Sequence, residues 1–251
     1  MAHKTMAGSR QSILNFPARP EYDFSNFVVS PGSQFAVSLA REICSGTELT
    51  YQTLFLTGGQ GMGKTHLLMA IGNHTAQSLP EKNVLYVHCP DFIRLSQSDS
   101  AETVPHSLAP FENLDFFLMD DVDKIAGHPA SQKKLYLIYN SIMTRGGKII
   151  FTGRTSLNDL PDTEDYLKSR FRWGMTAEIQ AMDDPTSARL FEKLGRDVGV
   201  AVPQKTIAYL LKRIPRDFPS IKDAVTRINE ESLKQKKKVS LPLVKTALSI
   251  P

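Results

Sequence analysis

The feature that most constrains the fold is the glycine-rich stretch GGQGMGKTHLL, which starts at Gly58 and directly follows the apolar segment TLFLT. It satisfies the pattern G-x-x-x-x-G-K-[ST], in which backbone N–H groups surround phosphate oxygens. The pattern requires a strand before the loop and a helix after it, because the helix N-terminus adds a positive dipole end. The sequence supplies both and therefore predicts a nucleotide phosphate site. Its expected residues are Gly58, Gly61, Gly63, Lys64, Thr65 and His66.

Four apolar strands alternate with helical patterns from Thr53 onward. They are expected at residues 53–57, 83–88, 114–120 and 148–152. Continuous apolar strands separated by helices are typical of a parallel sheet covered on both faces. Gly146 and Gly147 predict the end of the helix before the last of these strands. We therefore predict an α/β domain over residues 21–181.

Only helical patterns follow, and each has apolar residues at spacings of three and four, as in the 207–214 segment. This predicts a small all-helical domain over residues 182–251. The first residues, 1–20, include Pro17 and Pro20 and show no sustained period, which predicts an extended arm.

Charge is unevenly distributed along the chain. Residues 1–181 hold 16 Lys and Arg against 18 Asp and Glu, whereas residues 182–251 hold 14 against 8. The basic C-terminal part fits either contact with nucleic acid or an acidic partner, or simply a solvated helical surface.

Membrane insertion and secretion are not expected. No apolar run approaches the roughly 20 residues that span a bilayer, and the amino terminus lacks the apolar core of a secretory signal. We therefore expect a cytoplasmic protein. Cys44 and Cys89 are far from any CxxC spacing, which favours buried reduced thiols over a disulfide or a zinc site.

The apolar stretch LDFFLMDD ends in two carboxylates, Asp120 and Asp121. A carboxylate at the end of a neighbouring strand is what a phosphate-bound metal needs, so we expect Asp120 and the Thr65 hydroxyl to hold Mg²⁺. Asp121 is the candidate for polarising the attacking water, with one methylene fewer than glutamate, which predicts weak hydrolysis. Alternatively, Asp121 and Asp123 form an acidic cluster at a helix N-terminus.

Four stretches of the chain resemble the AAA+ ATPases of the DnaA family, over about residues 22–250. They are YDFSNFVVSPGSQFA, GGQGMGKTHLLMAIGN, FFLMDDVDKIAG and LKSRFRWG. The resemblance implies an AAA+ P-loop fold with a helical lid, ADP or ATP as ligand with Mg²⁺, and Phe27 and Val28 as adenine contacts. LKSRFRWG is the most specific of the four for this family.

The same resemblance implies a role for Arg170. In AAA+ proteins an arginine of one subunit touches the γ-phosphate held by its neighbour and stabilises the charge that develops there. Such a contact in trans implies self-association or a related partner. The alternative is a surface arginine in an ion pair with Glu164 or Asp165.

Two regions distinguish this sequence from the initiators of the family. Initiators continue into a helix-turn-helix domain, whereas this sequence ends at Pro251, so no sequence-specific DNA-binding domain is expected. Initiators also grip single-stranded DNA through a basic insertion. The matching region, 91–115, has Arg94 as its sole Lys or Arg against five acids, so we expect no such grip.

The arm carries Gln11, Leu14 and Phe16 in the order Q-x-x-L-x-F. This resembles the short peptide that docks on the DNA polymerase sliding clamp, a mode that suits an extended segment. The alternative is a linker whose Phe16 packs on the core.

Together, a clamp peptide and a DnaA-like ATPase module resemble the Hda-type regulators of this family. The resemblance implies a regulator that docks on the clamp and stimulates ATP hydrolysis by the DnaA initiator. The alternatives are an ATP-dependent adaptor or loader that places another replication protein, such as a helicase, on DNA, and an autonomous ATPase.

Two positions depart from the family pattern. Pro219 stands where the family has an arginine in the lid, and Lys222, one turn further on, is a candidate substitute. Arg154 stands where a polar sensor usually ends the fourth strand. Both departures predict altered nucleotide sensing.

Overall fold

The structure, a computed structural model, describes residues 13–15, 19–47, 49–98, 111, 113–155 and 160–250, and residues 13–15 by their backbone alone. By their contacts these residues form two compact units. The first comprises the chain up to Phe27, Ala36–Gly58 and Lys64–Glu178. The second begins at Ile179 and also includes two short earlier segments, Val28–Phe35 and Gly59–Gly63.

One six-stranded sheet organises the first unit, with the order β1-β3-β4-β5-β2-β6. The strands are β1 Ile13–Asn15, β2 Thr53–Gly58, β3 Val84–His88, β4 Phe116–Asp120, β5 Lys148–Gly153 and β6 Met175–Ile179. Strands β3, β4, β5 and β2 are parallel neighbours, and β1 adds to the edge antiparallel to β3. The parallel sheet predicted from the continuous apolar runs is confirmed. Strands β2 and β4 are buried along their whole length.

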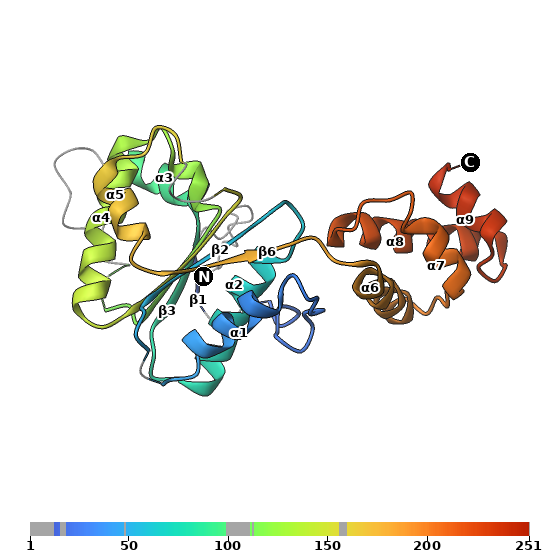
Figure 1. Cartoon of the computed structure of the whole chain (residues 1–251), viewed down its shortest axis with the longest axis horizontal. Coiled ribbons are helices and arrows are strands. Elements are labelled where there is room, and N and C mark those ends of the chain that lie inside the picture. The colour runs from blue at the N-terminus through green and yellow to red at the C-terminus, as the bar shows by residue number, and fades with distance from the viewer. Residues whose placement is uncertain are drawn as a thin grey trace, which may run out of the picture. The chain divides into compact units, whose positions relative to one another are not determined.

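Helices cover both faces of this sheet (Figure 1). They are α1 Gln34–Ile43, α2 Lys64–Ser78, α3 Cys89–Ser98, α4 Pro129–Thr144 and α5 Asp165–Phe171, with a 3-10 turn, η2, at Val122–Ile125. Helices α1 and α2 lie on one side of the sheet and α3, α4 and α5 on the other. Helix α4 ends two residues before Gly146, whose φ of 76° confirms the predicted stop signal.

The core under α3 and α4 is built from strand residues that point to that face. Phe55, Val87, Phe117 and Phe151 from four adjacent strands pack there against the buried side of α4, including Leu135. Because the four strands are parallel, the polar residues that follow them lie at one edge of the sheet.

The second unit is helical, as predicted. Its helices are α6 Asp184–Asp197, α7 Gln204–Leu210, α8 Phe218–Gln235 and α9 Leu241–Leu248. Asp183 and Asp217 accept backbone N–H bonds at the starts of α6 and α8, at 2.9 and 2.8 Å. Side chains at the predicted three- and four-residue spacings, such as Ile207 and Leu210, form a core of this unit's own.

Both cysteines are free and buried, which confirms the predicted reduced thiols. Burial raises the pKa of the Cys44 and Cys89 thiols to about 12. Among the described residues, no helix is both long and apolar enough to cross a membrane.

Candidate functional site

The predicted phosphate loop connects β2 to α2 and contains three glycines with positive φ. The angles are 150° at Gly58, 74° at Gly61 and 98° at Gly63. Side chains other than hydrogen rarely adopt such angles. The loop therefore has the backbone freedom that a turn around phosphate oxygens requires, and it runs directly into the N-terminus of α2.

Lys64 is the first residue of α2 and is only 7% exposed. Its ammonium donates to the Gly58 carbonyl at 2.8 Å, back across the loop. Burial lowers the pKa of Lys64, while the nearby carboxylates of Asp121 and Asp120 act in the opposite direction and the positive charge of Arg154 lowers it further. The amine is thus held inside the loop, next to two carboxylates.

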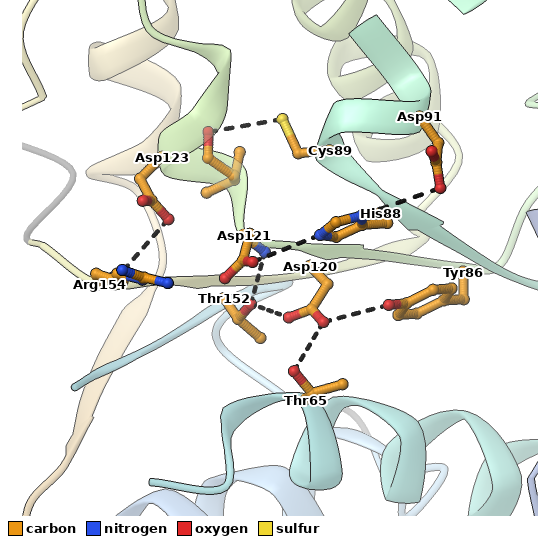
Figure 2. Close-up of polar contacts among 11 residues, drawn as sticks. Thr65, Tyr86, His88, Cys89, Asp91, Asp120, Asp121, Asp123, Thr152 and Arg154 are labelled. Atoms are coloured by element: carbon orange, nitrogen blue, oxygen red, sulfur yellow. Dashed lines mark hydrogen bonds and ion pairs between the residues drawn. The ribbon is translucent and has the colours of Figure 1, made fainter. Parts of the chain in front are cut away.

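Asp120 ends β4 and is only 4% exposed. Its partners are three hydroxyl groups on three different elements (Figure 2). They are Thr65 Oγ1 at 2.8 Å, Tyr86 OH at 3.2 Å and Thr152 Oγ1. Burial, and then the charge of Asp120, raise the pKa of Tyr86, so its hydroxyl stays protonated as a donor. The carboxylate is therefore held in place from three sides.

The pairing of Thr65 with Asp120 fits a Mg²⁺ site. A carboxylate and a hydroxyl are the hard oxygen ligands that Mg²⁺ prefers, and its remaining ligands are commonly phosphate oxygens and water. Within the described residues, no group of three or more His, Cys, Asp and Glu could hold a metal by itself. The two oxygens of Thr65 and Asp120 leave most positions around such an ion to other ligands.

Asp121 adopts a left-handed conformation, with φ 55° and ψ 46°. Its N–H donates to Thr152 Oγ1 at 2.9 Å, and its carboxylate lies 3.4 Å from His88 Nε2. His88 in turn has its Nδ1 3.9 Å from Asp91. The two neighbouring carboxylates therefore have different surroundings: Asp120 faces hydroxyl donors, and Asp121 faces an imidazole (Figure 2).

Asp123 belongs to the first turn of η2, which agrees with the alternative of an acid near a helix N-terminus. It also accepts the backbone N–H of Arg154 at 3.3 Å. Arg154 is thereby tied to the turn after β4, at the same edge of the sheet as Asp120.

The segment before α1 is bound to α2 through His66. Its Nε2 lies 2.9 Å from the Asp23 carbonyl, and its ring meets the edges of Tyr22 and Phe27 at centroid distances of 5.2 and 5.3 Å. His66 therefore positions Phe27, one of the two expected adenine contacts. The other, Val28, packs against the core of the second unit.

Pro219 is the second residue of α8, and its surroundings include the phosphate loop segment of the same unit. The Phe218 N–H donates to the Gly61 carbonyl at 3.3 Å. A Cβ at Gly61 would come within 2.7 Å of Pro219 Cδ. Both the positive φ and this close approach therefore require glycine at Gly61. Lys222 is exposed, with its ammonium 5.9 Å from the Phe218 ring centroid.

Arg170 lies in the last turn of α5 and is half-buried. Its Nε donates to Asn140 Oδ1 at 3.1 Å, and its Nη2 lies 3.5 Å from Tyr136 OH. The guanidinium also lies over the rings of Tyr136 and Trp173, at 5.5 and 4.9 Å. The Arg170 carbonyl accepts a bond from Tyr139 OH at 3.0 Å.

These partners of Arg170 are neutral, which differs from the alternative of an ion pair. Among the described residues, no ion pair joins Arg170 to Glu164 or Asp165. Trp173, 70% exposed, lies at the surface beside it. Tyr136 and Asn140 were not predicted from the sequence; their four-residue spacing on α4 places them on one face of that helix.

The predicted clamp-binding peptide is described only in part. Gln11 and Phe16 lie outside the described residues. Leu14 is the central residue of β1, where its backbone is in register with Tyr86 of β3.

Comparison with known proteins bears on this geometry. Residues 18–178 match the family described as the bacterial DnaA ATPase domain, and residues 183–248 match the family described as the Hda lid domain.

The chain is 31% identical over 219 residues to the chromosomal replication initiator protein DnaA of Limosilactobacillus reuteri, which covers 86% of this chain and 49% of that protein. It is also 31% identical over 241 residues to DnaA of Roseiflexus castenholzii, covering 96% of this chain and 49% of that protein. The chain thus spans about half the length of these relatives.

Similarity to solved structures agrees with these family matches. Domain III of the Thermotoga maritima replication initiation protein DnaA superposes with a TM-score of 0.85 at 27% identity, covering 93% of this chain and 98% of that one. The AMPPCP-bound DnaA of Aquifex aeolicus gives 0.77 at 25% identity, covering 87% and 68%. A Thermotoga maritima RuvB branch migration motor, at 16% identity and a TM-score of 0.64 over 91% of this chain and 71% of that one, shares the AAA+ fold. The chain belongs to the DnaA family of AAA+ ATPases, with a lid of the Hda type.

Proposed function

We propose that this protein is an Hda-like regulator of replication initiation, which binds ADP or ATP, docks on the DNA sliding clamp and stimulates ATP hydrolysis by the DnaA initiator. The observation that carries the proposal is the setting of Arg170. A half-buried guanidinium, oriented by an amide and two aromatic rings, keeps its positive charge available to an anion on another molecule.

The nucleotide binds at the loop between β2 and α2. Lys64 neutralises phosphate charge from within the loop, and Thr65 and Asp120 hold Mg²⁺, which neutralises further phosphate charge when bound. The AMPPCP bound by the related Aquifex aeolicus protein supports a nucleotide ligand. Phe27, oriented by His66, and Val28 contact the adenine.

Arg170 acts in trans. It reaches the γ-phosphate in the initiator and stabilises the charge that develops as phosphoryl transfer proceeds. Asn140 and Tyr136 are positioning residues, since they touch the guanidinium and not the nucleotide. Hydrogen bonds with Asn140 and then with Arg170 lower the pKa of Tyr136, which agrees with a ring that faces a cation. The same surface supports self-association with a second copy of this chain.

Hydrolysis at the protein's own site is weak in this proposal. Asp121 has the short side chain expected to reach water poorly, and its carboxylate faces the His88 imidazole. A site that binds nucleotide and hydrolyses it slowly suits a regulator, because the bound nucleotide then acts as a switch between an ATP form and an ADP form.

Docking on the clamp uses Gln11, Leu14 and Phe16. The Leu14 backbone belongs to the edge strand β1, which pairs with β3. In this proposal β1 either leaves β3 when the peptide docks, or stays paired with β3 while its side chains bind the clamp. An edge strand with few residues is easily exchanged for another partner.

The test is ATP turnover by the initiator, measured with this protein in the presence and absence of clamp loaded on DNA. We expect stimulation only when loaded clamp is present. The double variant Gln11→Ala, Leu14→Ala should lose it, and the matched variant Ser12→Ala should keep it. Stimulation of equal size without clamp, or by the double variant, removes the docking part of the proposal.

A second candidate function is an ATP-dependent adaptor or loader that places a replication protein such as a helicase on DNA. The net excess of Lys and Arg in residues 182–251 favours it. This function predicts helicase capture that depends on ATP and not on clamp, so the same assay with helicase in place of initiator discriminates the two.

A further inference from the structure

The charges of the second unit are segregated by helix. All eight of its acids after residue 182 lie on α6, on α8 or at the residues that cap them. They are Asp183, Asp184, Glu192, Asp197, Asp217, Asp223, Glu230 and Glu231. The other two helices, α7 and α9, and their flanking segments 198–216 and 236–250 contain no Asp or Glu. Their eight cations are Lys205, Lys212, Arg213, Arg216, Lys236, Lys237, Lys238 and Lys245.

Tyr209 of α7 brings cations of both segments together. The Arg213 guanidinium lies 3.7 Å from the ring centroid, and the Lys245 ammonium of α9 lies 5.7 Å from it. Arg213 Nη1 also donates to the Tyr209 carbonyl at 3.1 Å. Lys205 stands one helical turn before this ring on α7, and Lys212 follows it in the turn just after the helix. We call these four cations around Tyr209 the basic cluster.

No ion pair among the described residues neutralises the basic cluster. Lys205, Lys212 and Arg213 are exposed and Lys245 is half-buried. Over residues 182–250, all of which the structure describes, the ion pairs join Arg216 to Asp184 at 2.7 Å and Arg227 to Asp223 at 3.7 Å, and involve no member of the cluster. Four cations without an acid in their two segments create a positive local potential, which favours the binding of a polyanion.

The aromatic side chain in the cluster indicates which polyanion fits. Sites for single-stranded nucleic acid offer exposed aromatic rings on which bases stack. Tyr209 is half-buried and contacted by two cations, and the large exposed apolar residues of the two acid-free segments, Val198 and Leu241, are aliphatic. The surface therefore offers charges to phosphates and no platform for bases, which fits a duplex backbone.

A membrane surface fits less well. A helix that lies in an anionic membrane inserts an apolar face into the lipid. The apolar face of α9, including Leu243, Val244 and Leu248, is buried in the core of its own unit. The apolar residues that α9 would insert into lipid are therefore already packed within its own unit.

We propose that the basic cluster binds the phosphate backbone of duplex DNA without reading its sequence. This goes beyond the regulator proposed above, because it assigns a DNA contact to the lid itself, independent of clamp and initiator. A chain tethered to a clamp on DNA would meet that duplex at high effective concentration, so a weak contact is sufficient.

The test is fluorescence anisotropy of the full chain with a labelled duplex of about two helical turns, roughly 20 base pairs. We expect a dissociation constant in the roughly 10⁻⁴–10⁻⁶ M range at physiological salt and a slope of log K against log salt of about −3 to −4, since each phosphate contact contributes about −0.9. The variant Lys205→Gln, Lys212→Gln, Arg213→Gln, Lys245→Gln should lose most of this slope and at least tenfold in affinity.

The matched control removes the same charge from the acid-carrying helices: Lys193→Gln, Arg196→Gln, Arg227→Gln, Lys234→Gln. It should retain most of the binding, and circular dichroism should show both variants folded. Equal losses in the two variants, or a wild-type affinity that does not respond to salt, would overturn the proposal. So would tighter binding to a single strand of the same sequence, or to vesicles of phosphatidylglycerol and phosphatidylcholine in equal amounts, than to the duplex.

Discussion

The surroundings of Asp120 and of Arg170 show two opposite ways of holding a charged side chain in one domain. Asp120 is almost fully buried and meets three hydroxyl donors from α2, β3 and β5. Arg170 is half-buried and meets a neutral amide and two aromatic rings at the protein surface. The first charge is bonded on several sides by its own chain, whereas the second is oriented and left uncompensated.

The difference indicates where each charge acts. A buried charge needs partners that offset the cost of its desolvation, and the three hydroxyls supply them for Asp120. This arrangement suits a ligand that is bound by this chain itself. Aromatic rings and an amide hold a guanidinium in a fixed orientation, but as neutral groups they do not cancel its positive charge. That arrangement suits an anion supplied by another molecule, and variants on each side should separate the two functions.

The largest expected effect on the protein's own ligand binding is on the nucleotide side. Lys64→Ala should weaken ADP binding by roughly 100-fold or more, because one charge-assisted contact contributes about 1.5–3 kcal/mol and Lys64 serves more than one phosphate oxygen. Titration with a fluorescent ADP analogue measures this. The control Lys124→Ala removes an exposed lysine of η2 and should bind like the wild type. Unchanged ADP affinity in Lys64→Ala would show that the loop does not hold phosphate.

A separate effect, on stability, is expected from Asp120→Ala. It leaves three hydroxyls without their shared acceptor, and we expect a loss of about 2–4 kcal/mol in the free energy of unfolding, since each unsatisfied buried group costs about 1–3 kcal/mol. Urea unfolding followed by circular dichroism measures it, with Asp123→Ala as the control on the neighbouring turn, where the loss should be under about 1 kcal/mol. An unchanged free energy of unfolding in Asp120→Ala would contradict a stabilising role for its three hydrogen bonds. The same variant should also lose the Mg²⁺ dependence of nucleotide binding.

The smallest effect is expected at the residues that orient Arg170. Asn140→Ala should lower stimulation of initiator turnover by about tenfold, equivalent to about 1.4 kcal/mol, because the guanidinium loses one of its fixed bonds. ADP affinity and urea stability should stay close to wild type, which a merely structural role would not allow. Lys133→Ala, an exposed change on the same helix, serves as the control. If Asn140→Ala stimulates like the control, Asn140 does not position Arg170.

The sequence predicts where Lys64, Thr65 and Asp120 lie in the fold because its signals there are local. A strand, a glycine loop and a helix are consecutive, and Asp120 directly ends an apolar run, so spacing alone places Lys64, Thr65 and Asp120 at one edge of a parallel sheet. The lid follows from the change to helical periodicity. These features need no knowledge of which strands are neighbours.

The missed residues depend on the order of the strands. Tyr86, His88 and Thr152 reach the two carboxylates because β3 and β5 flank β4, an order that the chain sequence does not reveal. The pairing of β1 with β3 is a further contact between distant segments. Asn140 and Tyr136 were missed for a similar reason, since the packing of α5 against α4 brings them to Arg170.

The most direct test of the central claim, that Arg170 acts on nucleotide held by another chain, compares three variants in initiator ATP turnover with clamp loaded on DNA. Arg170→Ala should lose stimulation by about 10³-fold or more, the loss expected of an arginine supplied in trans, while its own ADP affinity stays unchanged. Arg170→Lys should restore little, because a lysine lacks the planar fork, and Arg172→Ala should stimulate like the wild type. Full stimulation by Arg170→Ala, or a loss of its ADP affinity in proportion to the loss of stimulation, would contradict the account.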